Sequence, residues 1–150
     1  MADMDRMLQL RRQGFYCSQI LMTMALDQQG RDDPALVRAM EGLAGGLGFV
    51  GETCGALTAG ASVLGLYAGR GRESEDDDPN LVFMVEDLVQ WFTEGYGREY
   101  GGIRCRDILG SDPNSQVTRC PAMVAGTFQK IKELLVERGF DLAGDPDDDD

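Results

Sequence analysis

Glycine is concentrated in one stretch of the chain, residues 42–60, where seven of nineteen residues are glycine. Glycine adopts backbone angles that other residues avoid, and it lets a helix or a ligand approach the main chain closely. One helix is therefore predicted to end near residues 45–48. The next is predicted to begin at Thr53, whose hydroxyl can cap its first turn. Cys54 would then lie in that first turn, where free amides and the helix dipole favour a thiolate.

Apolar side chains recur at steps of three and four along most of the chain, which predicts amphipathic helices. No alternation typical of strands competes with this pattern. The predicted fold class is all-α, a helical bundle of about four main helices with short extra helices. The expected helices cover residues 3–13, 17–29, 34–47, 53–67, 80–92 and 121–138, with a short helical turn at 106–109, a polar loop at 70–79 and a frayed or bent segment at 95–102.

A chain of 150 residues is long enough to bury a real core and short enough to form one domain. We assign residues 1–143 to a single cysteine-containing helical domain. Residues 144–150 are rich in aspartate and are predicted to be a disordered acidic tail.

Charge excludes several classes of partner. The formal net charge is −12, from 26 acidic and 14 basic residues. Nucleic acid needs a basic surface, and an anionic lipid surface attracts basic segments, so neither is expected as a partner. The chain has no apolar run long enough to span a bilayer, and its first residues lack the apolar core of a signal peptide. We therefore expect a cytoplasmic protein, and the glycine-lined helices would permit a homodimer.

The chain has four cysteines and no histidine. In a reducing compartment, four cysteines indicate metal binding or redox chemistry more than a disulfide framework. The lack of histidine removes Ser-His-Asp and Cys-His catalysis, zinc sites with imidazole ligands and histidine-ligated haem.

Every cysteine falls at a predicted helix N-terminus or just before one: Cys17, Cys54, Cys105 and Cys120. Such a position stabilises negative charge on sulfur or on an anionic cluster. Arg104, Arg106 and Arg119 flank two of the cysteines, which is more than chance predicts in so acidic a chain. The spacings of 37, 51 and 15 residues match no local metal motif, so the fold has to bring the four together. The alternative is that they are inert core cysteines.

A second pattern, Gly46-x-Gly48-x-x-Gly51, matches the dinucleotide-binding fingerprint. It follows a predicted helix rather than a strand and has no βαβ unit around it. We interpret it as a chance match within the glycine-rich loop.

With these residues placed, nearly the whole chain resembles the C_GCAxxG_C_C family, small proteins described as redox-active because of their four cysteines. The resemblance rests on Cys17 before an apolar helix, on Cys54-Gly-Ala-Leu-Thr, on Cys105-Arg-Asp-Ile-Leu-Gly and on Cys120. Ala59 stands where the family motif has its last glycine. A similar domain precedes the haem part of split-Soret cytochromes, which carry an iron–sulfur centre, so the resemblance implies an iron–sulfur cluster as a candidate cofactor.

Three functions follow from this constellation. In the first, the four cysteines bind a small iron–sulfur cluster for electron transfer to an unidentified redox partner protein, and helix dipoles and nearby arginines raise its potential. In the second, the protein has no metal, and a thiolate at Cys54 attacks a disulfide while a second cysteine such as Cys17 resolves the product. In the third, the protein is a non-enzymatic helical module with a structural metal or inert cysteines.

Overall fold

The computed structural model describes residues 2–147, which fold entirely into helices and connecting loops and so confirm the predicted all-α class. Among these residues the β-type pairing is confined to an isolated bridge between Thr53 and Arg104. None of their helices is long and apolar enough to cross a membrane. The elements are α1 (Ala2–Arg12), α2 (Cys17–Gln29), α3 (Pro34–Met40), the 3-10 turn η1 (Glu41–Leu43), α4 (Gly55–Ala68), α5 (Asn80–Phe92), the π-helical turn η2 (Thr93–Gly97), α6 (Arg98–Tyr100), α7 (Cys105–Leu109) and α8 (Ser115–Glu137).

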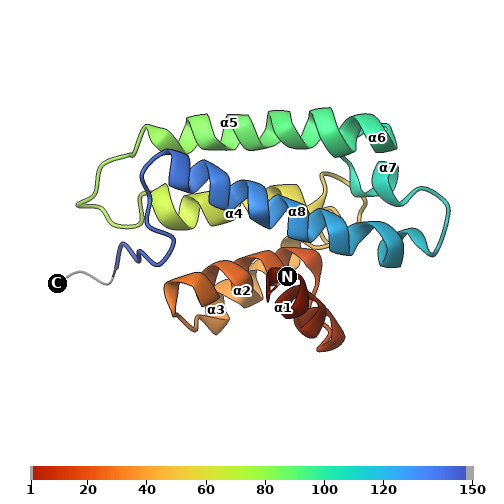
Figure 1. Ribbon diagram of the computed structural model, residues 1–150, viewed down its shortest axis with the longest axis horizontal. Coiled ribbons are helices and arrows are strands. Elements are labelled where there is room, and N and C mark those ends of the chain that lie inside the picture. Colours follow the sequence, from red (N-terminus) through yellow and green to blue (C-terminus); the bar gives the residue numbers. More distant parts are fainter. Residues whose placement is uncertain (1, 148–150) are drawn as a thin grey trace.

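The helices are arranged in three layers (Figure 1). Helix α5 forms one outer layer, α4 and α8 form the middle, and α2 with α1 and α3 forms the other outer layer. Helix α4 is central, because it packs against α2, α5 and α8. The short helices α6 and α7 lie together at one end of the bundle.

Close packing around α4 depends on its small residues. A Cβ atom at Gly60 would lie 2.9 Å from Leu88 Cδ2 on α5 and 3.3 Å from Ile131 Cδ1 on α8. The backbone of α4 therefore touches side chains of both neighbours, as the glycine and alanine content of this helix predicts.

The glycine-rich loop is a left-handed turn, and here the prediction of one helix over residues 34–47 is wrong at its C-terminal end. Helix α3 stops at Met40 and η1 stops at Leu43. The next residues, 45–49, all have φ between 58° and 74°. Glycine adopts this conformation freely, so three glycines allow the turn, although Leu47 and Phe49 also adopt it. Leu47, which the apolar stripe placed in the core, is 45% exposed.

Helix α8 begins earlier than its sequence suggests. We predicted that Cys120 and Pro121 open it, but the helix starts at Ser115 and contains both. Asp112 accepts a hydrogen bond from the Asn114 amide (2.9 Å) just before the first turn. Pro121 is the seventh residue of α8, beyond the first turn, so it removes one backbone hydrogen bond from the interior of the helix.

The segment predicted to fray after α5 is instead a helical continuation. Residues Thr93–Gly97 form a π-helical turn that leads directly into α6, and the chain leaves the helix at Gly101, where φ is 85°.

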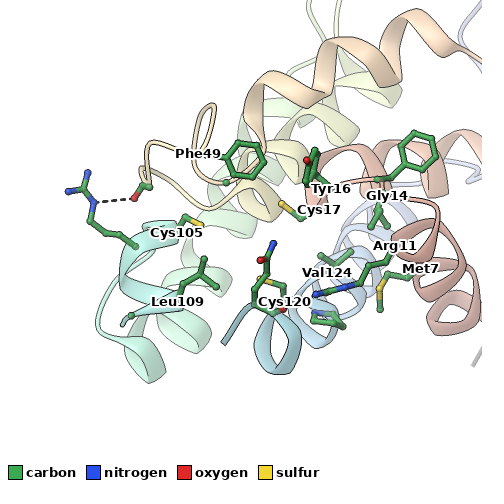
Figure 2. A pocket seen from close by; sticks show the side chains of 18 residues that line it. Met7, Arg11, Gly14, Tyr16, Cys17, Phe49, Cys105, Leu109, Cys120 and Val124 are labelled. Atoms are coloured by element: carbon green, nitrogen blue, oxygen red, sulfur yellow. Dashed lines mark hydrogen bonds between the residues drawn. The ribbon is translucent and has the colours of Figure 1, made fainter. Parts of the chain in front are cut away.

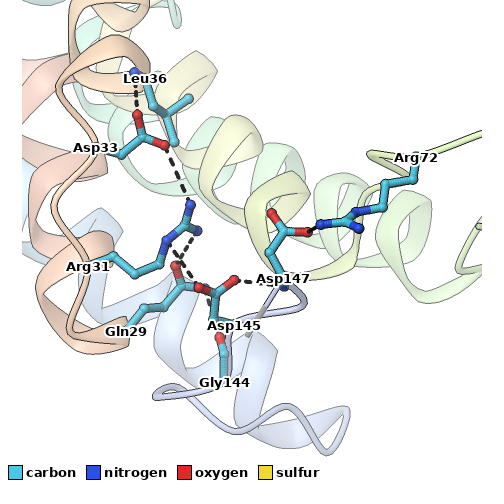
Figure 3. Close-up of polar contacts among 8 residues, drawn as sticks. All are labelled: Gln29, Arg31, Asp33, Leu36, Arg72, Gly144, Asp145 and Asp147. Atoms are coloured by element: carbon cyan, nitrogen blue, oxygen red, sulfur yellow. Dashed lines mark hydrogen bonds and ion pairs between the residues drawn. The ribbon is translucent and has the colours of Figure 1, made fainter. Parts of the chain in front are cut away.

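The described part of the acidic tail, residues 144–147, makes polar contacts with the bundle (Figure 3). Arg31 pairs with Asp145 (3.2 Å), and Gln29 donates a hydrogen bond to the Gly144 carbonyl (2.8 Å). Arg72 pairs with Asp147 (3.2 Å). Basic and amide groups at the far end of α2 and in the loop after α4 thus contact this acidic segment. The rest of the predicted tail, 148–150, lies outside the described residues.

Two of the three glycines of α4, Gly60 and Gly65, provide a test of this packing. Gly65→Ala is expected to raise the free energy of unfolding by about 0.5–1 kcal/mol, because a Cβ there meets no atom within 4 Å and alanine favours helix. Gly60→Ala is expected to lower it by about 1–2 kcal/mol, because Leu88 and Ile131 have to move. Urea denaturation of both variants makes the measurement, and equal stabilisation by both would contradict the packing.

Candidate functional site

Main-chain hydrogen bonds join two distant segments that each carry a cysteine. The Cys54 amide donates to the Ile103 carbonyl (2.9 Å), and the Cys105 amide donates to the Glu52 carbonyl (2.7 Å). The bridge between Thr53 and Arg104 lies between these bonds. Cys54 and Cys105 are therefore held near one another by backbone geometry, although 51 residues separate them in the sequence.

Glycine brings the third cysteine close to this pair. A Cβ atom at Gly55 would lie 2.8 Å from the Cys17 sulfur, so the first residue of α2 packs directly on the first turn of α4. The backbone amide of Gly45, in the left-handed turn, acts to lower the pKa of Cys17, although burial dominates and raises it. Gly55 of α4 therefore provides space for this sulfur, and Gly45 of the glycine-rich loop provides a nearby backbone amide.

The fourth cysteine comes from α8. Cys120 lies one residue after Arg119, whose guanidinium donates to the Ile108 carbonyl of α7. This contact fastens the first turns of α8 to the helix that Cys105 begins. The early start of α8 means that Cys120 is the one cysteine that does not lie at a helix N-terminus.

The structure brings all four predicted site residues to one place. Cys17, Cys54, Cys105 and Cys120 line a small, partly open cavity of about 20 Å³. Three of them, all except Cys54, also line a larger open pocket of about 490 Å³ (Figure 2). All four are free thiols. Within residues 2–147, no group of three or more cysteine, aspartate or glutamate side chains is arranged to hold a single metal ion.

Burial reverses the acidity that we predicted for Cys54. This residue is the N-cap of α4 rather than part of its first turn, and its side chain accepts no capping hydrogen bond, although the nearby backbone amides of Ala56 and Leu57 act to lower the pKa of its thiol. Those amides favour a thiolate, but Cys54 is 8% exposed, and desolvation raises the pKa of its thiol to about 12. Thr53, predicted as the cap, instead pairs with Arg104 in the bridge.

Burial also raises the pKa values of the other three thiols. Burial raises the pKa of Cys120 to about 11 and raises the pKa values of Cys17 and Cys105. Negative charge at Cys17 would raise the pKa of each of the other three further. Four thiolates at this site would therefore repel one another strongly unless a cation compensated their charge.

The three arginines predicted to support the site have other partners. Arg104 and Arg106 both pair with Glu52, and Arg119 lies over the ring of Tyr100. The cation that lowers the pKa values of Cys17 and Cys120 is Arg11, at the C-terminal end of α1. It extends across the pocket toward Cys120 (Figure 2).

Sequence reasoning missed Arg11 because it considered only residues adjacent to a cysteine. A signal was available: α1 ends five residues before Cys17, so the last turn of α1 had to lie near that sulfur. The pairing of residues 51–54 with 103–106 carried no signal, since a two-residue bridge has no periodicity to detect.

The protein is thus a small all-helical bundle in which four free cysteine thiols line one cavity. Residues 15–134 match the family described as "Putative redox-active protein (C_GCAxxG_C_C)", and this segment contains all four cysteines. The chain belongs to the C_GCAxxG_C_C family, as its motifs predicted. Searches of curated proteins and of solved structures gave no match.

Thiol reactivity tests the burial of the site. In reduced, metal-free folded protein, Cys54 is expected to react with iodoacetamide at pH 8 about 100-fold or more slowly than in the unfolded chain, because few molecules carry the thiolate. Its pKa rises from 9.0 to about 12 on folding, so its stabilising contribution is complete below pH 9 and is lost as the pH rises toward 12. Mass spectrometry of labelled peptides measures the rates. Rapid reaction of Cys54 with iodoacetamide would instead support the prediction that Cys54 is a thiolate.

Two glycines of the left-handed turn test how tightly the loop fits the site. Gly48→Ala is expected to cost about 1 kcal/mol of stability, because φ is +58° but nothing lies within 4 Å of the new Cβ. Gly46→Ala adds a clash with the Glu52 amide nitrogen at 2.6 Å and is expected to cost about 3 kcal/mol or more. Chemical denaturation compares the two variants. A Gly46→Ala protein as stable as the Gly48→Ala protein would show that the loop can move away.

Proposed function

We propose that this protein is an electron carrier whose four cysteines hold a small iron–sulfur cluster. One observation carries the proposal: thiols from four separate segments of the chain line a single cavity. Membership of a family described as redox-active supports a redox role over a purely structural one.

Thiol–disulfide exchange is the main competitor, and the site suits it less well. An attacking cysteine needs an accessible, low-pKa thiolate. Here burial raises all four pKa values, and the cysteine we favoured as nucleophile, Cys54, is the most strongly shifted of those with a value. Metal coordination removes this obstacle, because a metal ion replaces the protons and compensates the charge of the thiolates.

The donor set fits an iron–sulfur cluster, because thiolate sulfur is the usual protein ligand of these clusters. Four thiolates also suit tetrahedral zinc, so the metal content of the protein distinguishes the two. Four cysteines without histidine are a common ligand set for iron–sulfur clusters. When bound, the cluster would supply one-electron transfer.

The residues of this chain would then have distinct tasks. The backbone amides of Ala56 and Leu57 act to lower the pKa of Cys54, and the backbone amide of Gly45 acts to lower the pKa of Cys17, so each places positive dipole character near a sulfur. Amide donors to ligand sulfurs stabilise the more negative state and so raise the reduction potential. Arg11 adds positive charge on the same side, in place of the three arginines that the sequence suggested.

The test is to purify the protein without oxygen and measure its visible absorbance with its iron, sulfide and zinc content. We expect charge-transfer bands and stoichiometric iron and sulfide. Substituting serine for any one of Cys17, Cys54, Cys105 and Cys120 is expected to remove most of the colour and iron. Met123 lines the same cavity and provides the control, because Met123→Leu conserves volume and should keep the iron.

Other results would decide against the proposal. Stoichiometric zinc without iron would indicate a structural module. Four titratable thiols with no metal, even after anaerobic reconstitution with iron and sulfide, would favour thiol–disulfide chemistry.

A further inference from the structure

A pocket of about 490 Å³ opens beside the cysteine site and has the properties of a small-molecule site. Its volume falls within the range of pockets that hold drug-sized ligands, about 300–1,000 Å³. Helices α1, α2, α7 and α8 and the left-handed turn surround it, and Cys17, Cys105 and Cys120 are part of its lining (Figure 2). A molecule in this pocket would therefore lie against the redox site.

The charge of the pocket is opposite to that of the protein. Its lining includes two arginines and no acidic residue, although the chain carries a net charge of −12. Arg106 is compensated, because it pairs with Glu52 and donates to the Gly51 carbonyl (3.2 Å). Arg11 has no carboxylate within ion-pair distance in the part of the chain described, and its guanidinium makes one hydrogen bond, to the Gln116 carbonyl (3.2 Å). Its remaining donors are available to an anion.

Aromatic rings form one wall of the pocket. Phe49 packs edge-to-face against Tyr16, with 5.0 Å between ring centroids, yet Phe49 remains 58% exposed. Its backbone is also in the left-handed region, at φ 65°, a conformation that costs a residue with a side chain about 1–2 kcal/mol. Strained residues concentrate at binding sites, where the surrounding structure maintains them. The strain here places an exposed ring at the edge of the pocket.

From these features we propose that the pocket binds a small, flat organic carboxylate. The planar guanidinium fork of Arg11 matches a carboxylate, and the rings of Tyr16 and Phe49 match a flat apolar body. The role of this ligand rests on the proposed function, since the ligand would be the molecule that reaches the redox site. The binding itself depends only on the pocket.

The experiment is isothermal titration calorimetry with 2-naphthoate and its neutral counterpart 2-naphthamide, on anaerobically purified protein. We expect naphthoate to bind at least 10-fold more tightly than naphthamide. Arg11→Gln should weaken naphthoate binding by about 10- to 100-fold and leave naphthamide nearly unaffected, because it removes a charge-assisted hydrogen bond. Phe49→Ala should weaken both compounds, because it removes the ring that both contact.

Arg12→Gln is the matched control, because it removes the same charge from the next residue, which is exposed and does not line the pocket. Equal affinity for the two compounds, no binding of either, or equal effects of the Arg11 and Arg12 substitutions would overturn the inference. Iron and sulfide assays on the same wild-type sample report on the proposed function separately. Charge-selective binding to an iron-free protein would support this inference while contradicting the cluster, and iron-loaded protein without charge selectivity would do the reverse.

Discussion

The site depends on a short backbone pairing between residues 51–54 and 103–106. Three amides donate across it, from Cys54, Cys105 and Arg106 to the opposite segment. Backbone bonds of this kind fix position more rigidly than side-chain contacts, because neither partner has rotamers to lose. The central helix α4 begins at one side of the pairing and α7 begins at the other. The bundle thus fixes the main chains of Cys54 and Cys105, and this limits where their sulfur atoms can lie.

The chemistry of the site follows from desolvation. Burial in the packed helical interior favours the four neutral thiols over the four charged thiolates. Repulsion between neighbouring thiolates disfavours the charged form further. The few compensating groups are backbone amides and Arg11. This balance favours the protonated site when no metal is bound, and it makes metal binding and proton release one linked event.

Periodic patterns made most of the fold predictable, and irregular backbone made the rest unpredictable. Helix α5 was predicted at its observed bounds, residues 80–92, since its apolar stripe begins and ends with the helix. The start of α8 was misplaced, because the proline rule points to Pro121 while the structure uses an aspartate turn at Asp112. The left-handed conformation of Leu47 and Phe49 was not predicted, since no sequence rule places residues with side chains in that region. The four cysteines were singled out correctly as a group that the fold brings together, but their acidity and their cationic neighbour depend on burial that only the packed bundle sets.

The positions of the cysteines along the chain have a consequence for folding. They extend from the start of α2 to the first third of α8, so the cavity exists only when both ends of the chain have docked on α4. An unfolded or half-folded chain therefore offers no preformed site, because the four cysteines lie far apart in the sequence. Any species that joins the four sulfurs would act as a cross-link closing long loops, with the entropic gain of a multiple disulfide. Such a link would slow global unfolding as well as serve the chemistry of the site.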